Sequence, residues 1–155
     1  MNAAAGAGRR GRAMRVIAVD YGSARTGIAL GDTHTRLAMP FTMFDHLAPH
    51  QLVAAIGKLV TEEGAQTVVV GLPLNMDGTM SAQAKKTEDF ITGLAAVVTV
   101  PIERMDERLT SYHAEGQLAG NFTRQQKRQR VDALAAARIL QDYFDQLPPR
   151  EPPLA

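Results

Sequence analysis

The stretch MRVIAVDYGSARTGIALGD, residues 14–32, contains two short apolar runs on either side of a glycine-bearing turn. Runs of this length and composition predict a β-hairpin with strands at Arg15–Asp20 and Arg25–Gly31. The first strand ends on a carboxylate, Asp20. An ionised acid at the end of a core strand must be paired, must bind a cation or must face a water-filled cleft.

Helical and strand patterns alternate along the rest of the chain. A third strand is expected at about Leu37–Met43, and TVVVGL and VPIERM predict two further strands. Apolar residues at helical spacing from Leu52, closed by Gly64, predict a helix between them. Three strands followed by alternating helices and strands indicate an α/β fold. Its five-stranded mixed sheet is expected to be antiparallel at its start, parallel later, and flanked by helices.

Three more helices are expected after the central strand TVVVGL and the turn-rich loop PLNMDGTM that follows it. One runs from Ser81 to Ala95 and a short one from Thr110 to Leu118. The last runs from about Arg124 to Leu147, where Thr123 and Gln126 match a capping box.

The 155 residues are enough for one domain with a single core, which we expect at residues 14–147. Residues 1–13 are expected to form a disordered tail and residues 148–155 a proline-rich tail. Cysteine is absent, which excludes disulfides and thiolate metal sites and agrees with a cytoplasmic setting. No apolar stretch is long enough to span a membrane.

Acidic residues gather at the predicted strand ends and on the last helix. Asp106 and Glu107 follow VPIERM, and the pleat predicts that only one of them faces the same cleft as Asp20. Asp132 shares an apolar stripe of the last helix, where a carboxylate needs a cation or a partner. Simpler roles stay open: Asp20 as a turn acid, Asp106 or Glu107 paired with Arg108, and Asp132 paired with Arg128.

Carboxylates from two strand ends and one helix would make an oxygen-rich site, which suits Mg²⁺ or Mn²⁺. Two such ions about 4 Å apart can stabilise the attacking and leaving oxygens of a phosphoryl displacement. The net charge is only +1, so binding of nucleic acid would need a local basic patch. Candidate residues for that patch, unless they form an ordinary solvated helix face, are Arg124, Lys127, Arg128 and Arg130, with Arg25 and Arg108.

Four motifs in order, VDYGSARTGIALGD, VVVGLPLNMDGT, DERLTS and VDALAAARILQDYF, closely resemble the YqgF (RuvX) family over about residues 14–147. The resemblance implies an RNase H-like fold and a divalent-metal nuclease. It assigns catalytic and metal-binding roles to Asp20, to Asp132 and to one acid of the Asp106–Glu107 pair. The wider superfamily carries an acid on its fourth strand, where this sequence has Gly71. The middle acid must then come from the next strand, and Glu107 is favoured because its longer side chain can cross from a neighbouring strand.

The resemblance implies processing of the 5′ end of pre-16S rRNA, so structured RNA is the expected partner. The alternative is a Holliday-junction resolvase or other DNA nuclease acting on branched DNA, and junction resolution would need a homodimer with two symmetry-related sites. Two further classes of function are less favoured. An ATP-binding phosphotransferase needs two such domains, and a non-catalytic nucleic-acid binder would not need three intact acids.

Overall fold

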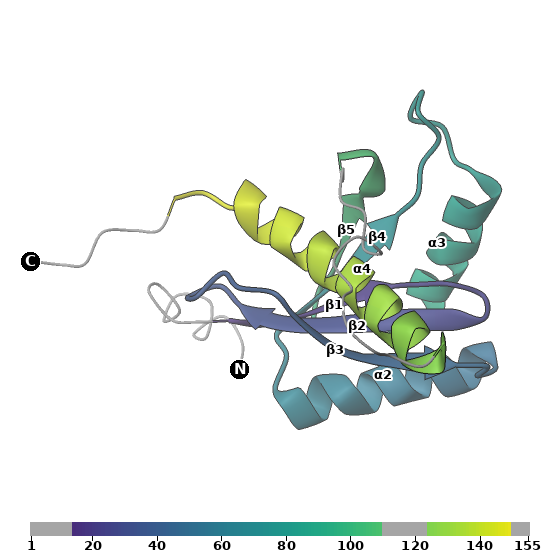
Figure 1. The fold of residues 1–155 in the computed structure, drawn as a ribbon, viewed down its shortest axis with the longest axis horizontal. Helices are drawn as coiled ribbons and strands as arrows, with labels where there is room; N and C mark the ends of the chain where they lie inside the picture. The colour runs from purple at the N-terminus through teal and green to yellow at the C-terminus, as the bar shows by residue number, and fades with distance from the viewer. Residues whose placement is uncertain (1–13, 110–123, 150–155) are drawn as a thin grey trace, which may run out of the picture.

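The computed structural model describes residues 14–109 and 124–149, with only the backbone described for residues 109 and 124–130. It is a three-layer α/β structure (Figure 1). The strands are β1 (Arg15–Asp20), β2 (Arg25–Asp32), β3 (Met39–Asp45), β4 (Thr67–Leu72) and β5 (Ile102–Asp106). The helices are α2 (Pro49–Glu63), α3 (Ala82–Ala95), α4 (Arg124–Gln146) and the 3₁₀ turn η1 (Glu107–Leu109).

The five strands form one mixed sheet in the order β3-β2-β1-β4-β5. β1 pairs antiparallel with β2, and β2 antiparallel with β3. β4 runs parallel to both β1 and β5. The predicted α/β fold and mixed sheet are therefore confirmed, and the carboxyl ends of β1, β4 and β5 lie at the same edge.

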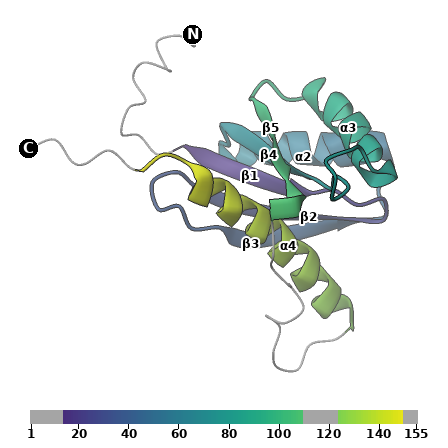
Figure 2. The same cartoon turned by 90° about the horizontal axis from the view of Figure 1, so that it is seen from above.

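Both faces of the sheet are covered. Figure 2 shows α4 on one side and α2 with α3 on the other. Successive side chains of β1 alternate accordingly: Ile17 and Val19 pack with α2 and α3, whereas Val16 and Ala18 pack with α4. The same alternation directs Asp20 to the α4 side. Burial on both faces explains why β4 is a continuous apolar run.

The helix α4 lies very close to β2. A Cβ atom added at Gly27 would overlap the backbone of Asp132, and one at Gly31 would lie 2.8 Å from the Phe144 ring. Only glycine lets a helix approach a strand this closely. Two glycines on the α4 face of one strand therefore fix where the helix lies.

The boundaries of several elements differ from the prediction. The third strand begins at Met39 instead of Leu37, and its pairing with β2 shifts register by one residue between Ile28 and Ala29. Gly64 ends α2 in the left-handed conformation, as predicted, and Ser81 caps α3 through a bond from the Ala84 amide. The predicted short helix at 110–118 and the capping box at Thr123 lie outside the described residues. Within the described ranges, no helix is long and apolar enough to cross a membrane.

Candidate active site

Asp20 stands at the carboxyl end of the central strand with a glycine beside it on each neighbouring strand. It pairs with Gly27 of β2, and on β4 the residue that follows the Val19–Val70 pair is Gly71. Burial, together with the nearby charges of Glu107 and Asp132, raises the pKa of Asp20 to about 7. No hydrogen bond or ion pair of its carboxylate is found within residues 14–109 and 124–149. When it is ionised, Asp20 therefore carries a charge that the described protein does not compensate.

Glu107 occupies the space that Gly71 leaves. A Cβ atom built on Gly71 would lie 2.7 Å from Oε2 of Glu107. Met105 packs on the α4 side of the sheet, and Glu107, two residues later, returns to that side at the start of η1. Burial, and then the charge of Asp106, raises the pKa of Glu107 above its ordinary value.

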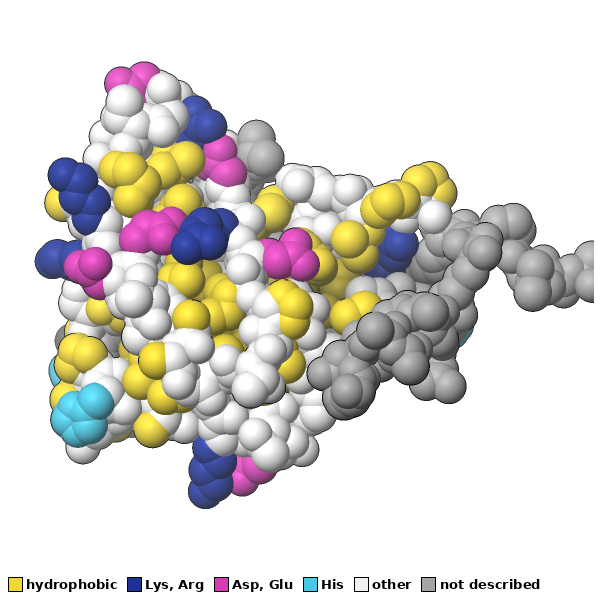
Figure 3. Space-filling model, turned by 180° about the vertical axis from the view of Figure 1, so that it is seen from behind, with side chains coloured by type: hydrophobic (Ala, Val, Ile, Leu, Met, Phe, Trp, Pro, Cys, Tyr) yellow, Lys and Arg dark blue, Asp and Glu magenta, His cyan; other side chains and the backbone are white. Residues whose placement is uncertain are grey.

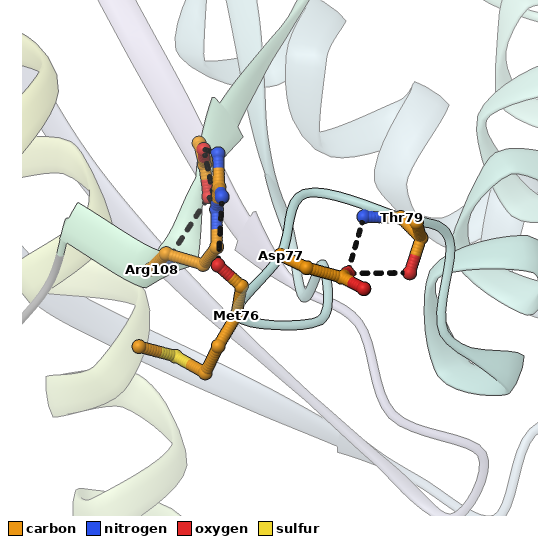
Figure 4. Close-up of polar contacts among 5 residues, drawn as sticks. Met76, Asp77, Thr79 and Arg108 are labelled. Atoms are coloured by element: carbon orange, nitrogen blue, oxygen red, sulfur yellow. Dashed lines mark hydrogen bonds and ion pairs between the residues drawn. The ribbon is translucent and has the colours of Figure 1, made fainter.

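The carboxylate of Asp106 is paired with Arg108, away from Asp20. Its carboxylate accepts hydrogen bonds from the Arg108 backbone amide at 2.9 Å and from Nη2 of the same arginine at 2.7 Å. These bonds lower the pKa of Asp106. Arg108 also donates from Nη1 to the Met76 carbonyl at 3.2 Å, next to a turn in which Thr79 donates to Asp77 (Figure 4). Of the two neighbouring acids, Glu107 is the one that lies with Asp20.

Asp132 reaches the same place from α4. Its backbone rests against Gly27, and its Oδ2 accepts a hydrogen bond from Nε of Arg25 at 2.9 Å. The sequence left Arg128 open as a partner for Asp132. The structure pairs Asp132 with Arg25, and the side chain of Arg128 lies outside the described part. An isolated glycine within a strand indicates a close backbone approach, so Gly27 could have indicated from the sequence that a backbone segment, here that of α4, packs against β2.

Asp20, Glu107 and Asp132 thus come from three elements and share one edge of the sheet. Their donor atoms are all carboxylate oxygens, the ligands that Mg²⁺ and Mn²⁺ prefer. As the side chains stand, no three acidic or histidine residues within the described ranges are close enough to hold one ion. This agrees with the position of Asp132, whose carboxylate is turned to Arg25. The chemistry of the donor set fits a divalent cation, which would have to draw the three carboxylates closer together.

The basic residues predicted to bind nucleic acid divide into two groups. Arg25 and Arg108 lie at the edge that carries the acids, and each is held in an ion pair. The side chains of the other four, which belong to the first turns of α4, lie outside the described part: Arg124, Lys127, Arg128 and Arg130. On the face seen in Figure 3, Lys and Arg side chains are interspersed with acidic ones and form no continuous patch.

Comparison with known proteins gives consistent results. The family model for RuvX, described as Holliday junction resolvase, matches residues 14–146. A protein of Chloroflexus aggregans named "Putative pre-16S rRNA nuclease" is 41% identical over 131 residues, covering 84% of this chain and 92% of that protein. One of the same name from Anaeromyxobacter sp. (strain Fw109-5) is 42% identical over 133 residues, covering 85% and 97%.

Solved structures support the fold. Thermus thermophilus RuvC in complex with a Holliday junction substrate superposes with a TM-score of 0.55 at 11% identity, covering 84% of this chain and 93% of that one. Another structure of T. thermophilus RuvC gives 0.53 at 12% identity, covering 84% and 94%. At such identities the likeness concerns the fold, and it confirms the expected RNase H-like architecture.

Proposed function

The chain belongs to the RuvX family of resolvase-like nucleases, and we propose that Asp20, Glu107 and Asp132 are the residues with which it cleaves phosphodiester bonds. The observation that carries this proposal is the uncompensated carboxylate of Asp20, set between two glycines and beside two further acids. Burying mutually repelling carboxylates costs folding free energy. Such an arrangement is typical of a functional site that a cation completes.

Asp20, Glu107 and Asp132 would together hold Mg²⁺ or Mn²⁺. When bound, such an ion stabilises the charge that develops on a phosphate and makes a bound water more acidic. Asp20 supplies the rigid position, because it belongs to the central strand of the sheet. Glu107 closes the site from the β5 side through the space above Gly71. Arg108 stands at the same edge, where its guanidinium can contact the sugar–phosphate backbone.

The substrate class that we propose is structured RNA, with maturation of the 5′ end of pre-16S rRNA as the reaction in ribosome biogenesis. The names of the curated relatives support it. Cleavage of branched DNA is the second candidate, favoured by the family description and by the junction-bound structure of similar fold. The second candidate needs two symmetry-related sites and therefore a dimer.

The test presents a 5′-extended 16S rRNA precursor and a four-way DNA junction side by side, in Mg²⁺ or Mn²⁺, to the wild type and to Asp20→Asn. Glu63→Gln is the matched control, because Glu63 is a carboxylate at the opposite edge, paired with Arg15 at the start of β1. We expect the wild type and the control to cleave the RNA faster than the junction, and Asp20→Asn to cleave neither. Cleavage by Asp20→Asn at the rate of the wild type would refute the assignment of the site. Faster cleavage of the junction would make the second candidate the function.

A further inference from the structure

One ion pair joins β2 and α4 at the candidate site. Nε of Arg25, the first residue of β2, contacts Oδ2 of Asp132 on α4 at 2.9 Å. The Asp132 side chain is 17% exposed and that of Arg25 is 39% exposed, so the contact is partly shielded. Resting on the proposed function, we propose that Arg25 competes with the cation for Asp132 and thereby lowers the cation affinity of the free protein.

The competition follows from the position of the Asp132 backbone. Because that backbone rests against Gly27, α4 cannot move closer to β2, and only rotation of the side chain can redirect the carboxylate. One of the two carboxylate oxygens of Asp132, Oδ2, accepts from the Arg25 guanidinium. A cation that recruits this oxygen must therefore displace a charge-assisted hydrogen bond. It must also approach a positive group that stands beside its ligand.

Among the side chains that the structure describes, no such competitor is found for the other two acids of the site. No ion pair of Asp20 or Glu107 is found within residues 14–109 and 124–149. Arg108, the second guanidinium at this edge, pairs with Asp106, which is not among the three proposed ligands. Removing Arg108 changes the local charge without releasing a proposed ligand. The two arginines are thus distinguishable by experiment.

Release of Arg25 has a second consequence. A guanidinium freed from Asp132 keeps its planar set of N–H donors at the edge where the substrate phosphate must lie, and that geometry matches phosphate. Cation binding and phosphate binding then favour each other, and the coupling must be equal in both directions. Arg25 is a positioning residue in this scheme, because it acts through Asp132.

The test measures Mn²⁺ binding to the full chain by isothermal titration calorimetry, without nucleic acid. Four proteins are compared: wild type, Arg25→Gln, Arg108→Gln and Arg15→Gln. Arg15 is the matched control, since its 3.1 Å pair with Glu63 lies at the opposite end of β1. We expect Arg25→Gln to bind Mn²⁺ about two- to fivefold more tightly than wild type, the range that a partly exposed ion pair allows. Arg15→Gln should be unchanged, and Arg108→Gln should gain less than Arg25→Gln.

Arg25→Met, which keeps most of the aliphatic stem, should show the same gain as Arg25→Gln if loss of the guanidinium is responsible. An affinity at or below that of wild type in both variants overturns the inference. So does an equal gain in Arg108→Gln, which would be a long-range charge effect. Absence of Mn²⁺ binding in every protein overturns the proposed cation site itself, a result distinct from binding that ignores Arg25.

Discussion

Replacing Asp20 by asparagine should stabilise the cation-free protein at pH 8. In the folded protein the pKa of Asp20 is raised from 3.8 to about 7 by burial and by the charges of Glu107 and Asp132. The folded state therefore holds this proton more tightly than the unfolded state does. Stability that depends on the proton is fully present below pH 3.8, declines as the pH rises toward 7, and is absent above it.

The size of the effect follows from the shift. Each pH unit between the two pKa values costs the wild type about 1.4 kcal/mol, so the full penalty is about 4 kcal/mol. Asparagine removes the charge but leaves a polar amide that also prefers a partner when buried. We therefore expect Asp20→Asn to raise the free energy of unfolding by about 2 kcal/mol at pH 8, and the gain to be largely gone at pH 4.

Urea unfolding in EDTA at pH 4, 6 and 8, followed by circular dichroism, measures this difference. Asp89→Asn on α3 is the control, because Asp89 is an exposed acid remote from the site in the fold. Adding Mg²⁺ at pH 8 should stabilise the wild type and not Asp20→Asn, since a ligand that binds only the folded state adds to its stability. A difference between Asp20→Asn and wild type that does not change with pH would refute the reasoning, because it would show that Asp20 is not a destabilising buried charge.

Three further outcomes are expected. Glu107→Gln should lose nearly all cleavage, whereas Asp106→Asn should keep most of it, and equal rates in a gel-based cleavage assay would contradict the division between the two acids. Gly27→Ala should lower the free energy of unfolding by about 3 kcal/mol, the upper end for overpacking, because the new methyl group overlaps the backbone of α4; thermal denaturation measures it, and a neutral result would mean that the helix can shift. Replacing Lys127, Arg128 and Arg130 of α4 by alanine should reduce the slope of log affinity against log salt by about 0.7–0.9 for each phosphate contact that is lost. Fluorescence anisotropy titrations measure this slope, and an unchanged slope would show that these side chains form a solvated helix face.

The fold could be predicted from the sequence because the signals for its helices and strands are local. β-branched runs, the glycine that ends α2 and the serine that caps α3 each specify an element within a few residues. β3 starts two residues later than the sequence predicts, and its pairing with β2 includes a register shift that no local pattern shows. Asp20 and Glu107 gather at one edge because the parallel strands β1 and β5 end together, whereas Asp132 comes to that edge through the packing of α4 against Gly27.

The orientation of each acid needed the structure. The pleat predicts that Asp106 and Glu107 point apart, but Gly71 and Arg108 determine which of them joins Asp20. The ion pair of Asp132 with Arg25 could not be predicted either, because Arg25 is 107 residues away in the chain. Sequence spacing along the helix indicated only Arg128, one turn earlier.

The two glycines that flank Asp20 also bear on how such sites change between relatives. Because neither glycine has a side chain, other groups lie next to them: Glu107 lies beside Gly71, and the α4 backbone lies against Gly27. A side chain on Gly71 would meet the ends of the Ile139 and Glu107 side chains, so an acid supplied from β4 itself would require Glu107 to turn aside. A side chain on Gly27 would meet the backbone of Asp132, so a relative with a larger residue there would have to move its helix. Among homologues, a larger residue at Gly71 should therefore accompany a different position of the proposed acid after β5, and a larger residue at Gly27 a different position of the helix that carries Asp132.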